Sequence, residues 1–242
     1  MLPGLIPPMS QFYQAVAVNF DGTNDYLTRG ATLTGAADSK LFTFFTWLNP
    51  SSSAATQRIV GCYNAVGGAA GNLIFRVTRT TTGAISLIGN NAAAAAILSI
   101  SSSAGAAPVG SWTSIAVSCD MANTGNRYLL INGVNDLATV TTYTNDTLDF
   151  TGLDWAVGAE ASGANKYAGD MSNTALRLGT YMTDVQMKAA FLNGNEPNDP
   201  GLYGFTPILG LSNPLATWQT NTGSGGGMTV TGALTAATSF PP

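Results

Sequence analysis

The chain has 242 residues, of which only 9% are charged, and its formal net charge is −4. It lacks the basic patch that nucleic-acid binding requires, and no apolar run reaches the ~18 residues of a membrane-spanning helix. Histidine is absent, which removes the commonest general base and the usual zinc sites. The length suits one sandwich with a single core, and the many small residues argue against large helices.

The N-terminal segment is expected to form an extended arm. Residues 1–14 include Pro3, Pro7 and Pro8, and proline can neither donate ladder hydrogen bonds nor continue a helix. The segment has no positively charged start and no unbroken apolar run, so we expect no signal peptide and synthesis in the cytoplasm. Its apolar residues are candidates for contacts in an assembly: Leu2, Leu5, Ile6 and Met9.

Residues 113–119 are predicted to form a half-buried strand. Ile115, Val117 and Cys119 alternate with small or polar residues, which is the period of two of a strand with one apolar face. Residues 128–131 predict the next strand. Asn132-Gly133 supplies the positive φ angles of a type I′ hairpin, after which a third strand should begin.

One short helix is predicted near residues 183–193. Thr183 and Gln186 have the spacing of a capping box, and Asp184 suits the positive end of the helix dipole. Asn193-Gly194 supplies a left-handed stop.

The segment 110–134 combines a Gly-x-Trp opening, an alternating strand, a polar loop and an aromatic-aliphatic strand that ends in Asn-Gly. It resembles the laminin-G-like branch of the concanavalin A-like lectin/glucanase superfamily. Further segments resemble the strands of this family in the same order: 20–27, 42–50, 155–158, 167–169 and 176–178. One departure is that Ser172 and Asn173 stand where the family often has an acidic residue, which puts any ligand role of that acid in doubt.

The resemblance implies an all-β fold, a jelly-roll sandwich of two antiparallel sheets with one short helix. We assign the sandwich to residues 15–195, after the Pro-rich arm of residues 1–14. The remaining residues 196–242 are a Pro/Gly/Thr-rich extension, and Glu196–Gly201 is the turn that ends the sandwich.

The segment from Trp218 to Leu234 resembles the C-terminal extension of laminin-G-like proteins encoded by tailed bacteriophages. This resemblance implies a virion structural protein, most simply a capsid decoration or head-fibre protein. It would be a homo-oligomer that binds other virion proteins through its terminal arms. The alternative is a tail-associated receptor-binding module that recognises a host glycan.

Catalysis is not expected. Glycosidases on this fold need two carboxylates beside the scissile bond. The chain has only two glutamates, Glu160 and Glu196, and no second acid shares a strand with Glu160. Together with the missing histidine, this leaves no candidate catalytic residue and no cofactor.

Calcium and thiol chemistry each have a structural alternative. Asp21, Asn24 and Asp25 are the densest group of oxygen ligands for calcium, yet Asp and Asn at this spacing more often form Asx-turns, which we expect here. Cys62 and Cys119 lie on apolar strands, and we expect buried free thiols rather than a disulfide or a metal pair.

Sugar binding would use exposed aromatic rings. Tyr63, Trp155, Tyr167 and Tyr181 are available, but Trp155 falls inside a strand pattern and should belong to the core. Tyr167 and Tyr181 flank turns, so we expect them to be the exposed pair and the candidate glycan contacts.

Overall fold

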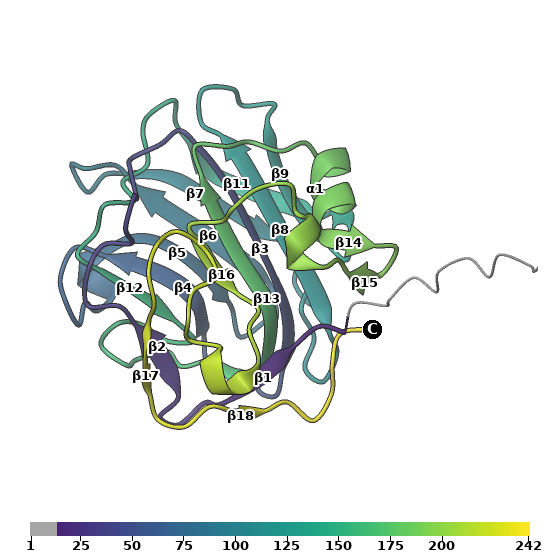
Figure 1. Cartoon of the computed structure of the whole chain (residues 1–242). Coiled ribbons are helices and arrows are strands. Elements are labelled where there is room, and N and C mark those ends of the chain that lie inside the picture. Colours follow the sequence, from purple (N-terminus) through teal and green to yellow (C-terminus); the bar gives the residue numbers. More distant parts are fainter. Residues whose placement is uncertain (1–13) are drawn as a thin grey trace, which may run out of the picture.

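A computed structural model describes residues 14–242, which form a sandwich of two antiparallel β-sheets (Figure 1). Sheet A contains, in spatial order, β10 (Val134–Asn135), β9 (Arg127–Ile131), β8 (Thr113–Asp120), β3 (Leu41–Pro50), β13 (Ala168–Leu178), β1 (Ala17–Asp21) and β18 (Thr235–Ala236), and β16 (Leu209–Leu211) also pairs with β13. Sheet B contains β11 (Leu137–Tyr143), β7 (Ala96–Ser102), β6 (Ile85–Asn90), β5 (Leu73–Arg79), β4 (Gln57–Tyr63), β12 (Asp154–Val157), β2 (Tyr26–Thr28) and β17 (Thr229–Thr231). The expected fold class is confirmed.

Short elements lie outside the two large sheets: α1 (Asp184–Phe191), the hairpin of β14 (Leu192–Asn193) and β15 (Glu196–Pro197), and the 3₁₀ helices η1 (Ala70–Asn72), η2 (Pro200–Leu202) and η3 (Leu215–Thr217). In Figure 1, α1 and the β14–β15 hairpin lie beside β8 and β9 of sheet A. Among the described residues, no helix is long and apolar enough to cross a membrane.

The main core lies between the sheets, and a second core covers the outer face of sheet A. Phe42 and Phe44 of β3 belong to the main core, whereas Phe45 packs in the second core against residues of α1. The same holds for β8, where Val117 faces the main core and Ala116 faces the second. The prediction of a half-buried strand at 113–119 was therefore wrong in this respect, because the second core buries the face that carries small residues.

The hairpin and helix signals have different outcomes. Asn132 and Gly133 have φ angles of 49° and 73°, so the predicted turn between β9 and β10 is confirmed. Thr183 caps α1 with the predicted capping box to Gln186. The predicted stop at Asn193-Gly194 was wrong, because the helix ends at Phe191 and Gly194, with φ of 66°, belongs to the β14–β15 turn.

The segment 196–242, expected as an extension after the sandwich, is built into both sheets. Its strands β16 and β18 pair with β13 and β1 in sheet A, and β17 pairs with β2 in sheet B. Trp218 is fully buried, and its ring lies edge-on to Phe20 of β1 at 5.8 Å. No break in the structure corresponds to residue 195, since the extension completes the edge of the core.

Both cysteines are free and buried in the main core, as predicted. Cys62 lies on β4 of sheet B and Cys119 on β8 of sheet A. Burial raises the pKa of the Cys119 thiol to about 12 and that of Cys62 further still. The raised pKa values and the burial both disfavour the reactive thiolate form.

Candidate functional site

A pocket of about 450 Å³ opens beside β13, where this strand changes its neighbour. Ser172 pairs with β1, whereas Thr174 pairs with β16. Asn173 lies between these two pairings with a φ of 47°, in the left-handed region. One side of the pocket is therefore formed by residues 173–175, at the discontinuity between β1 and β16.

The second side is an aromatic wall made of Tyr203 and Phe205, which follow η2. Tyr203 is 5% exposed, and its ring meets Phe191 of α1 edge-on with centroids 5.0 Å apart. Phe191 in turn stacks on Phe45 of β3 at 4.4 Å. Phe205 is half-buried, and the Arg177 guanidinium lies 4.6 Å from its ring centroid. The aromatic wall is thus fixed by its packing on α1 and sheet A.

The third side depends on the buried side chain of Asn221. Its Oδ1 accepts hydrogen bonds from the backbone N–H groups of Gly210 at 2.7 Å and Gly223 at 2.8 Å, and its Nδ2 donates to the carbonyl of Ile208 at 2.8 Å. A Cβ on Gly210 would lie 2.6 Å from Oγ1 of Thr222, so only glycine fits there. These contacts hold Gly210 and Thr222 at the pocket.

The polar lining of the pocket carries a single carboxylate. Hydroxyl and amide groups are contributed by Asn173, Thr174, Thr206, Ser212 and Thr222. Asp199 is the acidic lining residue, and its Oδ1 accepts a hydrogen bond from the N–H of Gly201 at 2.8 Å. An aromatic surface with a few directed polar groups suits a small hydroxyl-rich ligand, and the volume lies within the range of about 300–1,000 Å³ of small-ligand sites.

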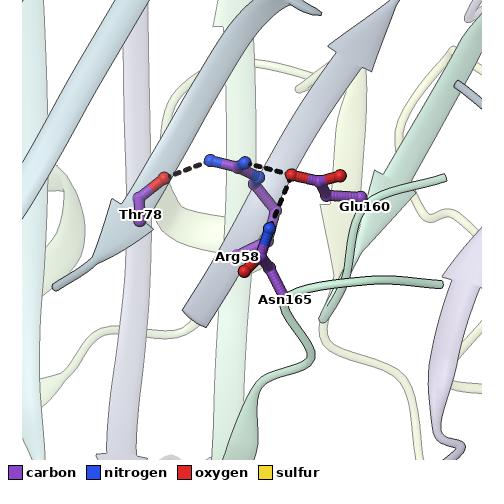
Figure 2. Close-up of polar contacts among 4 residues, drawn as sticks. All are labelled: Arg58, Thr78, Glu160 and Asn165. Atoms are coloured by element: carbon purple, nitrogen blue, oxygen red, sulfur yellow. Dashed lines mark hydrogen bonds and ion pairs between the residues drawn. The ribbon is translucent and has the colours of Figure 1, made fainter. Parts of the chain in front are cut away.

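A second polar cluster lies on sheet B, away from this pocket. Figure 2 shows the guanidinium of Arg58 between Thr78 and Glu160. The Arg58–Glu160 ion pair measures 2.6 Å, and both side chains are 2% exposed. Asn165 also donates to Oε1 of Glu160 at 2.8 Å. Glu160 is therefore bound in a buried ion pair, whereas Glu196 is exposed on β15.

The predicted calcium candidates come together, but as a turn. Oδ1 of Asp21 accepts hydrogen bonds from the N–H groups of Thr23 at 2.7 Å, Asn24 at 2.9 Å and Asp25 at 3.3 Å. These bonds, with Asn24 and Thr23 contributing most, lower the pKa of Asp21. The carboxylate of Asp25 is buried and accepts from the N–H groups of Asp21 and Ala233. The prediction of an Asx-turn is confirmed, and within residues 14–242 no group of three or more acidic, cysteine or histidine side chains is arranged to hold a metal.

The predicted glycan contacts, Tyr167 and Tyr181, do not line the pocket. The expected exposure of Tyr167 was wrong, because its side chain is fully buried and its hydroxyl donates to the carbonyl of Asp170 at 2.9 Å. Burial raises the pKa of Tyr167 well above its usual value. Tyr181 is half-buried and stacks on Tyr128 with centroids 6.3 Å apart.

The remaining predicted contacts, Leu2, Leu5, Ile6 and Met9, lie outside the described residues. Sequence reasoning missed the aromatic wall because Tyr203 and Phe205 fall in the segment expected to follow the sandwich. The sequence did contain a signal for this aromatic wall. Tyr-Gly-Phe lies between Pro200 and Pro207, so two aromatic residues fall close together on a segment that prolines constrain.

Residues 21–176 match a laminin G-type family described as the concanavalin A-like lectin/glucanases superfamily. The chain belongs to this superfamily. A search of curated proteins found no relative. Among solved structures, this superfamily member is similar to a candidate carbohydrate binding protein from Bacteroides ovatus, with a TM-score of 0.65 and 14% identity over 95% of this chain and 62% of that one. It thus spans less than two thirds of the Bacteroides protein.

A second similar structure is the heptameric SAP-like pentraxin from Limulus polyphemus, with a TM-score of 0.62 and 13% identity over 93% of this chain and 95% of that one. At such identities the likeness establishes the fold and nothing finer.

Proposed function

We propose that this superfamily member is a non-enzymatic carbohydrate-binding protein, with the pocket beside β13 as its saccharide site. The observation that carries the proposal is that the aromatic wall of Tyr203 and Phe205 shares one pocket with the hydroxyl groups of Ser212 and Thr222. A sugar ring can place its C–H face on the aromatic wall while its hydroxyls exchange hydrogen bonds with the polar side.

The comparisons support saccharide as the ligand class. The superfamily is described by its lectins and glucanases, and the Bacteroides ovatus protein is described as carbohydrate binding. The pocket itself favours a neutral saccharide. Asp199 is its acidic lining residue, and no Lys or Arg among the described residues lines it.

The non-enzymatic assignment depends on the positions of the carboxylates. Glycoside hydrolysis uses a pair of carboxyl groups roughly 5–10 Å apart on either side of the scissile bond. Among the described lining residues, Asp199 alone carries a carboxylate, and Glu160 is held by Arg58 on sheet B. We therefore expect a saccharide to bind without being cleaved.

The test uses an array of neutral oligosaccharides, followed by titration calorimetry on those that bind. Phe205→Ala removes half of the aromatic wall, and we expect at least about a tenfold loss of affinity. Phe240→Ala is the matched control, since Phe240 is 45% exposed and does not line the pocket. Equal affinity in both variants, or cleavage of a bound saccharide by the wild type, would contradict the proposal.

A second proposal concerns the assembly in which the protein works. The resemblance of residues 218–234 to extensions of tailed-phage proteins supports a virion structural role, as a homo-oligomeric capsid decoration or head-fibre protein. A tail-associated receptor-binding module is the alternative, and the pocket would then recognise a host glycan. Because Trp218 and β17 are built into the sandwich, the N-terminal arm is the better candidate for attachment.

The arm can be tested directly on particles. Deleting residues 2–9 removes Leu2, Leu5, Ile6 and Met9 together, and we expect a folded protein that is missing from purified virions. Full occupancy of the truncated protein on particles would exclude attachment by the arm.

A further inference from the structure

The outer face of sheet B carries a row of polar side chains that the pocket does not use. Val77, Leu87 and Ile100 of β5, β6 and β7 belong to the main core. Because side chains alternate along a strand, their neighbours point to the outer face. In one row across this face, Arg76 pairs with Ile88 and Ile88 pairs with Ser99.

The adjacent row on the same face begins at the buried ion pair of Figure 2. Arg58 pairs with Thr78, Thr78 with Ser86, and Ser86 with Ser101. Arg58 and Arg76 therefore lie on neighbouring rows of one face. With Glu160 included, this group carries two guanidinium charges and one carboxylate, so its net charge is +1.

Arg76 forms no ion pair with the described residues. It is half-buried, and none of the Asp and Glu residues of the described chain comes within 4.0 Å of its guanidinium. Its Nε is buried without a hydrogen-bond partner among the described residues. Burial, and to a smaller extent the like charge of Arg58, lowers the pKa of Arg76. The outer face of sheet B therefore carries a partly desolvated cation that a ligand can reach.

Neither terminal segment of the given sequence offers Arg76 an acidic side chain. Residues 1–13 contain no Asp or Glu, so the arm brings no carboxylate. The C-terminal residue Pro242 lines a depression with Trp47 and Trp112 on the outer side of sheet A. A negatively charged ligand would supply the missing ion-pair partner.

Hydroxyl groups lie on β6 and β7, in the row of Arg76 and in the adjacent row. Ser86, Ser99 and Ser101 are half-buried, and their hydroxyls make no hydrogen bond within residues 14–242. The side chain of the buried Tyr63 lies close to Gly61, which pairs with Arg76, because a Cβ on Gly61 would lie 2.5 Å from the Tyr63 hydroxyl oxygen. A guanidinium on a face with three free hydroxyls can recognise both a carboxylate and the hydroxyls of a sugar ring.

We propose that the outer face of sheet B is a second binding site, which takes an acidic saccharide and pairs its carboxylate with Arg76. A monoanion balances the +1 charge of the group, and a planar carboxylate matches the fork of an arginine. The serine hydroxyls of β6 and β7 bind the ring. This site does not depend on the aromatic pocket, which lies on the other sheet.

The test is a titration of the whole chain with D-glucuronate, in which ¹H–¹⁵N NMR spectra monitor binding. We expect saturable shifts on β5, β6 and β7, and a loss of affinity of about tenfold or more in Arg76→Gln because a charge-assisted hydrogen bond is removed. Arg127→Gln is the matched control, since Arg127 is half-buried, pairs with the core residue Cys119 and lies over Tyr143. Arg76→Lys keeps the charge and should restore part of the affinity.

The proposal would be overturned if glucuronate showed no saturable binding, or if Arg76→Gln and Arg127→Gln lost equal affinity for it. It would also be overturned if acetate and sulfate bound as tightly as glucuronate, because this would then be a site for simple anions. Melting temperatures verify that each variant is folded. Ser99→Ala leaves the charge of the site unchanged but removes a hydroxyl, so it should also weaken glucuronate binding. Phe205→Ala separates the two sites, because it should leave glucuronate binding unchanged even if the pocket fails to bind any neutral saccharide.

Discussion

The pocket beside β13 and the outer face of sheet B are built by different means. The pocket combines one strand with segments that pack over it from residues 199–222, and its aromatic wall is held by α1. The outer face of sheet B needs only strand register, because pairing alone aligns Arg76 with Ile88 and Ser99. One site is aromatic with a single carboxylate, and the other is polar with a net positive charge.

This difference in construction predicts a different ligand selectivity for each surface. The pocket offers shape and an apolar ring surface, so its selectivity should follow the stereochemistry of a neutral sugar. The sheet face offers a desolvated guanidinium, so its selectivity should follow charge and weaken as salt is added. A single sandwich therefore carries two surfaces of opposite character on its two sheets.

The largest effect is expected when the buried ion pair under the sheet B face is broken. Glu160→Gln leaves the charge of Arg58 buried without a counter-charge, which should lower the free energy of unfolding by about 3–5 kcal/mol. Urea denaturation measures this change. Glu196→Gln is the control, because Glu196 is exposed and its replacement should change stability by less than about 0.5 kcal/mol. Equal stabilities would show that the ion pair does not support this face.

A smaller effect is expected on the pocket side. Phe191→Leu removes the ring that stacks on Phe45 and supports Tyr203, and the loss of the aromatic pairs should cost about 0.5–1.5 kcal/mol. The variant should also weaken neutral saccharide binding and leave glucuronate binding unchanged. Phe240→Leu is the control in both measurements. If both ligands lost affinity equally, the two surfaces would not be independent.

The smallest effect is expected at the Asp21 turn, which belongs to neither surface. The pKa of Asp21 is lowered in the folded protein, so its contribution to stability is present above about pH 4 and is lost as the pH falls through the folded pKa. Asp21→Asn should lower the free energy of unfolding at pH 7 by less than about 1 kcal/mol, because the side chain is exposed and its charge is screened.

The difference between wild type and Asp21→Asn should shrink below about pH 4, as urea denaturation at several pH values would show. Asp149→Asn serves as a comparison, since among residues 14–242 the side chain of Asp149 accepts only from the backbone and hydroxyl of Thr151. A difference that persists at low pH would mean that the amide alters the turn itself.

Structural features that depend on a few neighbouring residues were predictable from the sequence. Asn132-Gly133 determines its turn because its φ angles are a local property, and Thr183 caps α1 because Gln186 lies one turn away. The helix end was not predictable in the same way. Leu192 leaves the helix to pair with Pro197, and this hairpin decides what Gly194 does.

The candidate sites were the least predictable part. Alternation indicates which face of a strand a residue occupies but not whether that face is covered, so Tyr167 was expected at the surface although its ring is packed against Phe20. Tyr203 and Phe205 become a pocket wall only because α1 packs beneath them.

By itself, the sequence predicted the fold class through its resemblance to the laminin-G-like family, the buried cysteines through their apolar strand patterns, and the Asx-turn at Asp21 through local hydrogen bonds. The tertiary structure alone decided which polar groups were paired and which were not. Arg58 and Arg76 have the same chemistry on neighbouring strands, yet Glu160 forms its ion pair with Arg58 and not with Arg76. That outcome depends on a loop about a hundred residues away from Arg58, which short-range patterns do not encode.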